Sequence, residues 1–136
     1  MRGAIAAMAM SGLRRVSTTV GMLDQAPPEA ILQDRAPGVF YRVPVARRPA
    51  LVEAAHIGYG TLGGVGFGLL PARWRRHTWA GPVYGLLFWA GYEAGIRPLL
   101  GLARDRHRRA PQRLALIADH LLYGVVVAAS PWPYRD

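Results

Sequence analysis

The sequence predicts an all-helical bundle that lies in a membrane. Hydrophobic residues make up 51% of the 136 residues, and they gather in long runs separated by arginine-rich segments. Three of these runs have no polar face, which is typical of helices surrounded by lipid or by a large core. A soluble domain of this length has no core large enough to surround three such helices. The pattern therefore predicts three membrane-spanning helices and a fourth, N-terminal helix.

The N-terminal helix is expected over residues 3–23. This run carries Arg14 and Arg15 in its middle, and its strictly apolar part, residues 4–10, is too short to cross about 30 Å of hydrocarbon. Its insertion as a membrane helix therefore depends on whether Arg14 finds an acidic partner.

The second helix is expected over residues 51–70, where only Glu53 and His56 are ionisable. Pro49 suits the first turn of a helix, and Pro71 ends the run.

The third helix is expected over residues 78–103 and the fourth over residues 113–130. Pro98 has no backbone N–H to donate, so we expect a kink or break in the third helix near Arg97. Prolines on both sides bound the fourth.

Residues 24–50 form a polar connector. The Pro27-Pro28-Glu29 sequence resembles a helix start, so a short amphipathic helix is expected from Glu29 to Arg35, with Ile31 and Leu32 as its apolar side. Residues 39–45 have no strand to pair with, and we expect them to form an extended loop at the membrane surface.

The charge of the chain is strongly basic, with a formal net charge of +9, and all seventeen basic residues are arginine. A soluble protein of this kind would first be interpreted as a nucleic-acid binder. The arginines, however, lie mainly between the apolar runs, and no basic stripe with interleaved aromatic residues follows a helix. This distribution argues against a nucleic-acid partner.

No sequence feature indicates an enzyme or a bound cofactor. The chain has no cysteine, which excludes disulfides, thiolate metal sites and cysteine nucleophiles. Phosphate-binding glycine loops, nucleophile elbows and catalytic triads are also missing from the sequence.

The distribution of arginine between the loops predicts an orientation. If the last three helices alternate in direction, the segments 24–50 and 104–113 share one side of the membrane and carry nine arginines, against four on the other side. Arginine is enriched in cytoplasmic loops. The connector is therefore expected in the cytoplasm.

A phrase of the form H-x-x-Y-G occurs twice, at residues 56–60 and 120–124. In a helix these three residues lie on one side. They could form a paired histidine–tyrosine site, or each histidine could bond to a neighbouring helix while the glycine permits close approach. We favour the second interpretation.

Glycines spaced four residues apart predict close helix contacts, because lipid-exposed helices associate through small residues. The same glycines would each cost roughly 1 kcal/mol in a soluble helix. They could join helices of this chain or of another copy. The glycines concerned are Gly60, Gly64, Gly68, Gly81, Gly85 and Gly124.

The ionisable residues within the apolar runs are all expected in the cytoplasmic half of the bundle. Such groups are costly in lipid and usually face partners or a cavity. This candidate cluster consists of Arg14, Glu53, His56, Glu93, Arg97, Asp119 and His120.

Three hypotheses explain the cluster. The favoured one is a set of mutually neutralising groups that fixes the register of the helices, with Glu93 and Arg97 paired one turn apart. The second is a proton or ion relay through His56, His120 and the carboxylates. The third is a metal site, which the single Glu53-x-x-His56 supports weakly because di-metal bundles use this spacing twice.

Several segments together resemble the YagU-like family of small bacterial inner-membrane proteins of unknown function. The resemblance covers most of the chain and implies about four membrane helices, a location in the bacterial cytoplasmic membrane and a true first helix over residues 3–23. It brings no established activity. The segments that carry it are Gly3-Ala4-Ile5-Ala6, Pro27-Pro28-Glu29-Ala30-Ile31, His56-x-x-Tyr59-Gly60, Gly81-x-x-Tyr84-Gly85 with Trp89 and Glu93, and His120-Leu121-Leu122-Tyr123-Gly124.

The sequence thus favours a non-enzymatic membrane protein with a structural role, acting as a homo-oligomer or as an accessory subunit of a larger membrane complex. The alternative is an oligomeric proton or ion conductor that uses the polar cluster.

Overall fold

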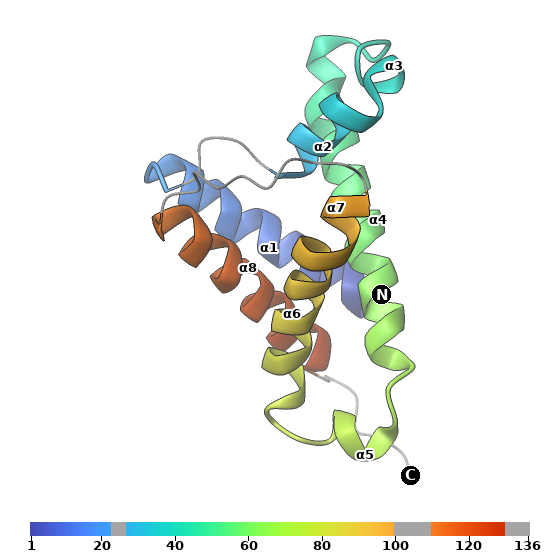
Figure 1. The fold of residues 1–136 in the computed structure, drawn as a ribbon, viewed down its shortest axis with the longest axis vertical. Helices are drawn as coiled ribbons and strands as arrows, with labels where there is room; N and C mark the ends of the chain where they lie inside the picture. The colour runs from blue at the N-terminus through green and yellow to red at the C-terminus, as the bar shows by residue number, and fades with distance from the viewer. Residues whose placement is uncertain (23–26, 100–109, 130–136) are drawn as a thin grey trace.

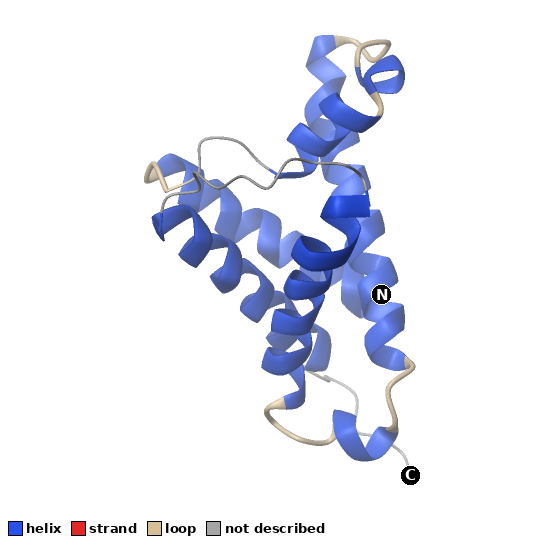
Figure 2. Cartoon of the chain, viewed as in Figure 1, coloured by secondary structure: helices blue, strands red, loops and turns tan. Residues whose placement is uncertain are grey.

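The computed structural model describes residues 1–22, 27–99 and 110–129, and all regular elements in these ranges are helices (Figures 1 and 2). The predicted all-α class is confirmed. Within these ranges, no helix has the length and mean hydropathy that crossing a bilayer requires. The elements are α1 (Arg2–Thr19), α2 (Pro27–Arg35), α3 (Pro37–Phe40), the 3-10 helix η1 (Val45–Arg47), α4 (Arg48–Gly68), α5 (Ala72–Arg75), α6 (Ala80–Gly91), the π-helix η2 (Tyr92–Ile96), α7 (Arg97–Leu99) and α8 (Ala110–Ala128).

The four long helices α1, α4, α6 and α8 form the bundle (Figure 1). Helix α1 packs against both α4 and α8, and α8 also packs against α6, whereas α4 and α6 have few close backbone approaches. Gly3 of α1 lies against Gly64 of α4, and Arg14 lies near His56, so these two helices run in opposite directions. The connector with α2 and α3 lies at one end of the bundle and α5 at the other.

The crossing of α1 and α4 brings two backbones into contact. A Cβ atom added to Gly3 would collide with the carbonyl oxygen of Gly60, and one added to Gly64 would meet the backbone of Gly3. Only glycine fits at such a crossing. Gly60 and Gly64 therefore pack as the sequence predicts.

The crossing of α6 and α8 has the same construction. A Cβ on Gly85 would collide with the carbonyl of His120, and one on Gly124 with the carbonyl of Gly81. Gly68 differs from the other glycines of the predicted set, because no described residue of another helix lies within 4 Å of its Cβ position. Packing of Gly68 against another copy of the chain stays a prediction.

These contacts predict opposite effects on stability for alanine substitutions at two glycines of α4. We expect Gly60→Ala to lower the free energy of unfolding by about 1–3 kcal/mol, because its Cβ would lie 2.6 Å from the Cβ of Ala7 and would push α1 away. Gly58→Ala is the matched control, since open space surrounds this position and alanine favours helix by up to about 1 kcal/mol. Unfolding in detergent measures both variants. Equal stabilities would contradict the close crossing.

Helix α1 is shorter than the predicted helix over residues 3–23. It ends at Thr19, and the backbone N–H of Met22 donates back to the carbonyl of Ser17 at 2.8 Å. Gly21, with φ of 74°, has the left-handed conformation that this type of helix end needs. The expected helix over residues 3–23 includes Gly21, which instead terminates α1.

The third predicted helix, residues 78–103, is continuous through Arg97 as far as Leu99, and the rest lies outside the described residues. The expected break is instead a π turn, in which the N–H of Arg97 donates to the carbonyl of Tyr92. In an α-helix, the carbonyl of residue 94 would accept a hydrogen bond from the N–H of residue 98, which proline lacks. The proline ring would also clash with that carbonyl. The wider turn lies where α geometry is unfavourable.

The other elements differ from the predictions mainly at their ends. Helices α4 and α8 begin before residues 51 and 113, because a proline at the second position is compatible with a first helical turn. The predicted helix in the connector is confirmed as α2.

The expected extended loop over residues 39–45 is wrong at its two ends, because α3 extends to Phe40 and η1 begins at Val45, and only residues 41–44 lie outside helices. Phe40 is buried at the end of α3, and the guanidinium of Arg48 lies 5.1 Å from the centre of its ring. This contact folds the connector back onto the start of α4.

Candidate functional site

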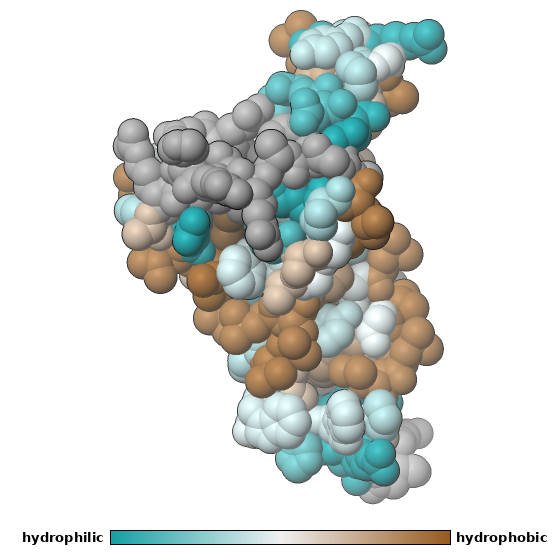
Figure 3. Space-filling model, viewed as in Figure 1, coloured by the Kyte–Doolittle hydropathy of each residue, from teal (hydrophilic) through white to brown (hydrophobic). Residues whose placement is uncertain are grey.

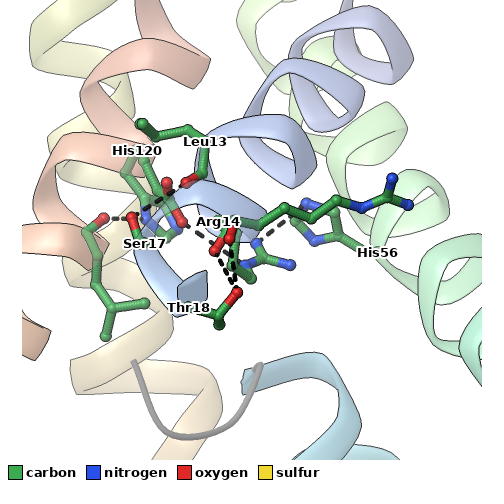
Figure 4. Close-up of polar contacts among 9 residues, drawn as sticks. Leu13, Arg14, Ser17, Thr18, His56 and His120 are labelled. Atoms are coloured by element: carbon green, nitrogen blue, oxygen red, sulfur yellow. Dashed lines mark hydrogen bonds and ion pairs between the residues drawn. The ribbon is translucent and has the colours of Figure 1, made fainter. Parts of the chain in front are cut away.

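The centre of the polar cluster is Arg14, which α1 holds between α4 and α8 (Figure 4). Its side chain is buried, with only 8% of the residue exposed. The guanidinium donates to Nε2 of His56 on α4 at 3.3 Å, and its Nε lies 3.6 Å from Oδ2 of Asp119 on α8. One cationic side chain therefore joins three helices.

The local backbone of α1 is also held at this point. The hydroxyl of Ser17 donates to the carbonyl of Leu13, and that of Thr18 donates to the carbonyl of Arg14, each at 3.1 Å (Figure 4). These hydroxyls satisfy their own hydrogen-bonding needs within the helix, so they do not compete for the Arg14 guanidinium.

The Arg14–Asp119 ion pair is buried, and some of its polar atoms make no hydrogen bond to a described residue. Asp119 has no exposed surface, and within the described residues neither of its carboxylate oxygens nor the Nε of Arg14 has a hydrogen-bond partner. Burial of each charge costs several kcal/mol, which the attraction between them offsets. Removal of either partner would leave the other charge uncompensated.

A second ion pair lies at the π turn. Nη1 of Arg97 lies 2.8 Å from Oε2 of Glu93, and the arginine is buried. The predicted pairing of these two residues is confirmed.

A cavity of about 220 Å³ adjoins both pairs. Its polar lining comes from three long helices and the π turn, and Ile31 and Leu32 of α2 contribute an apolar part of the wall. The apolar side of the connector helix is thus turned toward the bundle. The arginine, histidine and glutamate residues of the lining are Arg14, His56, Glu93 and His120.

The structure does not place all predicted site residues in this lining. Asp119 and Arg97 lie outside it, each paired with a residue that does line the cavity. Glu53 is partly exposed one turn before His56 on α4 and does not line the cavity. The cluster is therefore a cavity with two supporting ion pairs, and Glu53 lies beside it.

Two of the cavity residues outside the predicted cluster carry polar atoms without a partner among the described residues. The hydroxyl of Tyr59 and the Nε1 of Trp89 are buried, and neither has a hydrogen-bond partner within the described ranges. The ring of Tyr59 stacks on Phe88 with a centroid distance of 4.8 Å. Tyr59 belongs to the repeated H-x-x-Y-G phrase, which was the one signal that could have indicated it.

The repeated phrase joins helices through its tyrosines. The hydroxyl of Tyr123 donates to the carbonyl of Gly60 at 2.6 Å, so the second copy of the phrase bonds to the glycine of the first. His56 contacts a neighbouring helix as expected, but Nδ1 of His120 bonds to the carbonyl of Leu116 on its own helix at 2.8 Å. The expectation that both histidines join helices is wrong for His120.

Metal binding has no matching geometry in the part of the chain that the structure describes. Over residues 1–22, 27–99 and 110–129, no three histidine, aspartate or glutamate side chains gather around a common point.

The chain was compared with protein-family models, with curated proteins and with solved structures, and no match was found.

Proposed function

We propose that the chain is an integral membrane protein of the bacterial cytoplasmic membrane, without enzymatic activity, that acts as a structural or accessory subunit. The polar cluster has the role of fixing how the helices pack. One observation carries this proposal, namely that an ionisable side chain is completely buried while large apolar side chains are exposed. Asp119 is completely buried, whereas Leu62 and Leu69 are 71% and 81% exposed.

Apolar residues face outward on all four long helices. Figure 3 shows them as a brown band between two more polar ends. Soluble monomers rarely expose continuous apolar surface on this scale, whereas a bilayer covers it. The exposed residues include Ile5, Met8 and Val16 on α1, Leu62 and Val65 on α4, Val83, Leu86 and Leu87 on α6, and Leu114 and Val125 on α8.

The way in which the helices touch also supports a lipid environment. Backbones meet at the Gly3–Gly64 and Gly81–Gly124 crossings. Such contacts are expected in lipid, where large apolar side chains gain little by packing against protein instead of lipid and helices associate through small residues. Several of the residues that lower the hydropathy of these helices are glycines and ionisable groups buried between helices, so they would not face lipid.

The excess of arginine in the connector and in residues 104–113 favours a cytoplasmic location for both segments. The polar cavity would then lie in the cytoplasmic half of the membrane, beneath α2. The resemblance to YagU-like proteins agrees with this location and remains a prediction.

The packing role is favoured over the proton or ion conductor because apolar side chains fill the interior next to the cavity. Tyr123 and Val127 have no exposed surface, and Phe67 is 3% exposed. A conductor would need an oligomer to provide another path.

Membrane insertion is testable in cells. We expect the expressed chain to stay in the membrane pellet through high-salt and alkaline carbonate washes, and to be released by detergent. The chain has no cysteine, so Gly38→Cys in the connector and Thr78→Cys near α5 give single-site reporters at two exposed positions. An impermeant maleimide applied to spheroplasts should label Thr78→Cys and spare Gly38→Cys.

Recovery of the chain from salt-washed cytosol without detergent would contradict the membrane proposal. Labelling of Gly38→Cys alone would keep the membrane location and reverse the orientation.

A further inference from the structure

A basic and aromatic surface lies at the α5 end of the bundle. Arg73, Trp74 and Arg75 belong to α5, and Trp79 directly precedes α6. We call these four residues the α5 patch. Arg73 is exposed, and Trp74 and Trp79 are 50% and 53% exposed, so the patch is open to the surroundings of the bundle.

Two contacts hold the α5 patch in place. The Nε of Arg75 donates to the carbonyl of Leu70, just beyond the end of α4, at 2.9 Å. The ring of His77 stacks on that of Trp79, with 5.1 Å between the ring centres and 14° between the planes. Arg75 and His77 thus position the patch, and the exposed guanidinium of Arg73 lies beside them.

The charge of the α5 patch is uniformly positive. Residues 54–92 contain no aspartate or glutamate, and the described acidic residues lie on α2, at the start of α4, in η2 and on α8. In the proposed orientation the patch faces outward, whereas arginine is enriched in cytoplasmic loops. The orientation therefore does not account for the arginines here, and an anionic partner would.

An apolar hollow of about 540 Å³ begins at the α5 patch. Trp74 and Trp79 line one end, and Val83, Leu87 and Gly91, spaced four residues apart, line it along α6. None of its described lining residues is charged. Val83 and Leu87 are 41% and 64% exposed, so the hollow lies open on the outer surface and suits a hydrocarbon chain.

The α5 patch lies where the surface changes from apolar to cationic. Leu69 is 81% exposed, and Arg73 follows four residues later. At this end of the molecule the brown band of Figure 3 gives way to paler and teal residues. Tryptophan is enriched at the depth of the lipid headgroups. A phospholipid makes the same change, from acyl chain to phosphate, over a similar distance.

We propose that the α5 patch binds the phosphate of an anionic phospholipid, with an acyl chain in the hollow along α6. The guanidinium of Arg73 donates to the phosphate oxygens, a charge-assisted contact that arginine geometry suits. The apolar hollow favours a lipid over a soluble phosphate. The proposal concerns binding only, and it rests on the proposed membrane location, because the bilayer supplies this ligand.

The test is fluorescence quenching of the full chain in phosphatidylcholine vesicles that contain brominated phosphatidylglycerol or brominated phosphatidylcholine. Bromine quenches tryptophans that it contacts. Trp89→Phe combined with Trp132→Phe leaves only Trp74 and Trp79 as reporters. We expect the phosphatidylglycerol to quench more strongly, with an affinity about fivefold or more above that of phosphatidylcholine, as one basic residue at an anionic membrane surface provides.

Three variants in this reporter chain locate the binding. Arg73→Gln should lower the preference for phosphatidylglycerol about fivefold, and Arg73→Lys, which keeps the charge, should retain most of it. Arg42→Gln removes the same charge from an exposed position in the connector, at the opposite end of the bundle, and is the matched control. It should leave the preference unchanged.

Three results would overturn the proposal. Equal affinity of the unsubstituted reporter chain for the two brominated lipids would show that the α5 patch does not select an anionic headgroup. An equal loss in Arg42→Gln and Arg73→Gln would assign the preference to net charge. Displacement of the lipid by glycerol phosphate at an equal concentration would assign the patch to a soluble phosphate.

Failure of this proposal is distinguishable from failure of the membrane proposal. A chain that needs detergent for extraction, retains its helical circular dichroism and shows no preference for phosphatidylglycerol overturns the lipid site alone. A chain recovered without detergent overturns the membrane location on which the site depends.

Discussion

Replacement of Asp119 by alanine is expected to lower the free energy of unfolding by about 3–5 kcal/mol, the cost typical of removing one partner from a buried ion pair. Asp119 is completely buried on α8, and its partner Arg14 is 8% exposed on α1. After the change, the guanidinium of Arg14 would remain between the helices with His56 as its neutral neighbour. Unfolding of the purified chain in mixed micelles, followed by circular dichroism, measures the loss.

A double variant separates the buried charge from the packing. Arg14→Met combined with Asp119→Leu removes both charges while keeping side chains of useful volume, and such replacements are often neutral or stabilising by about 1–4 kcal/mol. We therefore expect the double variant to be at least as stable as the wild type, although Asp119→Ala is much less stable. Asp34→Asn on the exposed side of α2 is the control and should stay within about 0.5 kcal/mol.

The same variants distinguish a packing role from ion conduction. If the cluster only fixes helix packing, liposomes that contain the wild-type chain should leak protons at the rate of empty liposomes, and Asp119→Ala should change stability alone. Unchanged stability of Asp119→Ala together with an altered proton flux would defeat the packing role and support the conductor.

The sequence was sufficient to predict that Arg14 needs an acidic partner but not to choose that partner. Glu53, Glu93 and Asp119 were all expected at a similar depth, so depth alone left three candidates. The choice follows from packing, because α1 lies against α8 at the level of Asp119, while Glu93 is engaged by Arg97. Which helix faces turn toward each other is a tertiary property that the spacing of residues on one helix does not contain.

The glycine stripe shows the same limit. Gly60, Gly64 and Gly68 share one face of α4, and the sequence treats them alike. Helix α1 contacts α4 at Gly60 and Gly64, whereas no described residue of another helix lies within 4 Å of the Cβ position of Gly68. The position of the neighbouring helix therefore decides which glycines of the stripe pack.

The polar tips of Tyr59 and Trp89 could not have been recognised from the sequence as unpartnered groups. Tyrosine and tryptophan in an apolar helix are equally typical of a membrane interface and of a core. Tyr84 and Tyr123 occupy comparable positions in the sequence, yet their hydroxyls donate to the carbonyls of α4. Only the positions of the donors and acceptors in the folded structure distinguish Tyr59 and Trp89 from Tyr84 and Tyr123.

Truncation of the Tyr123 side chain is expected to cost about as much stability as the loss of Asp119. It is completely buried, its ring stacks on Phe88 of α6, and its hydroxyl donates to the carbonyl of Gly60 on α4 at 2.6 Å. Tyr123→Ala should lower the free energy of unfolding by about 3–5 kcal/mol, as large-to-small changes of buried aromatic residues do. Tyr123→Phe keeps the ring and loses one hydrogen bond, so its cost should be about 1 kcal/mol.

The difference in the free energy of unfolding between Tyr123→Ala and Tyr123→Phe tests how α8 is joined to α4. Few backbone approaches connect these helices, so the Tyr123 side chain provides much of their contact. Tyr41→Ala at an exposed position is the control and should cost less than about 1 kcal/mol. If Tyr123→Ala is as stable as the wild type, neither the ring nor its hydroxyl packs in the core and the arrangement of α8 against α4 is wrong. A loss confined to the phenylalanine step would instead mean that the hydrogen bond alone holds the two helices together.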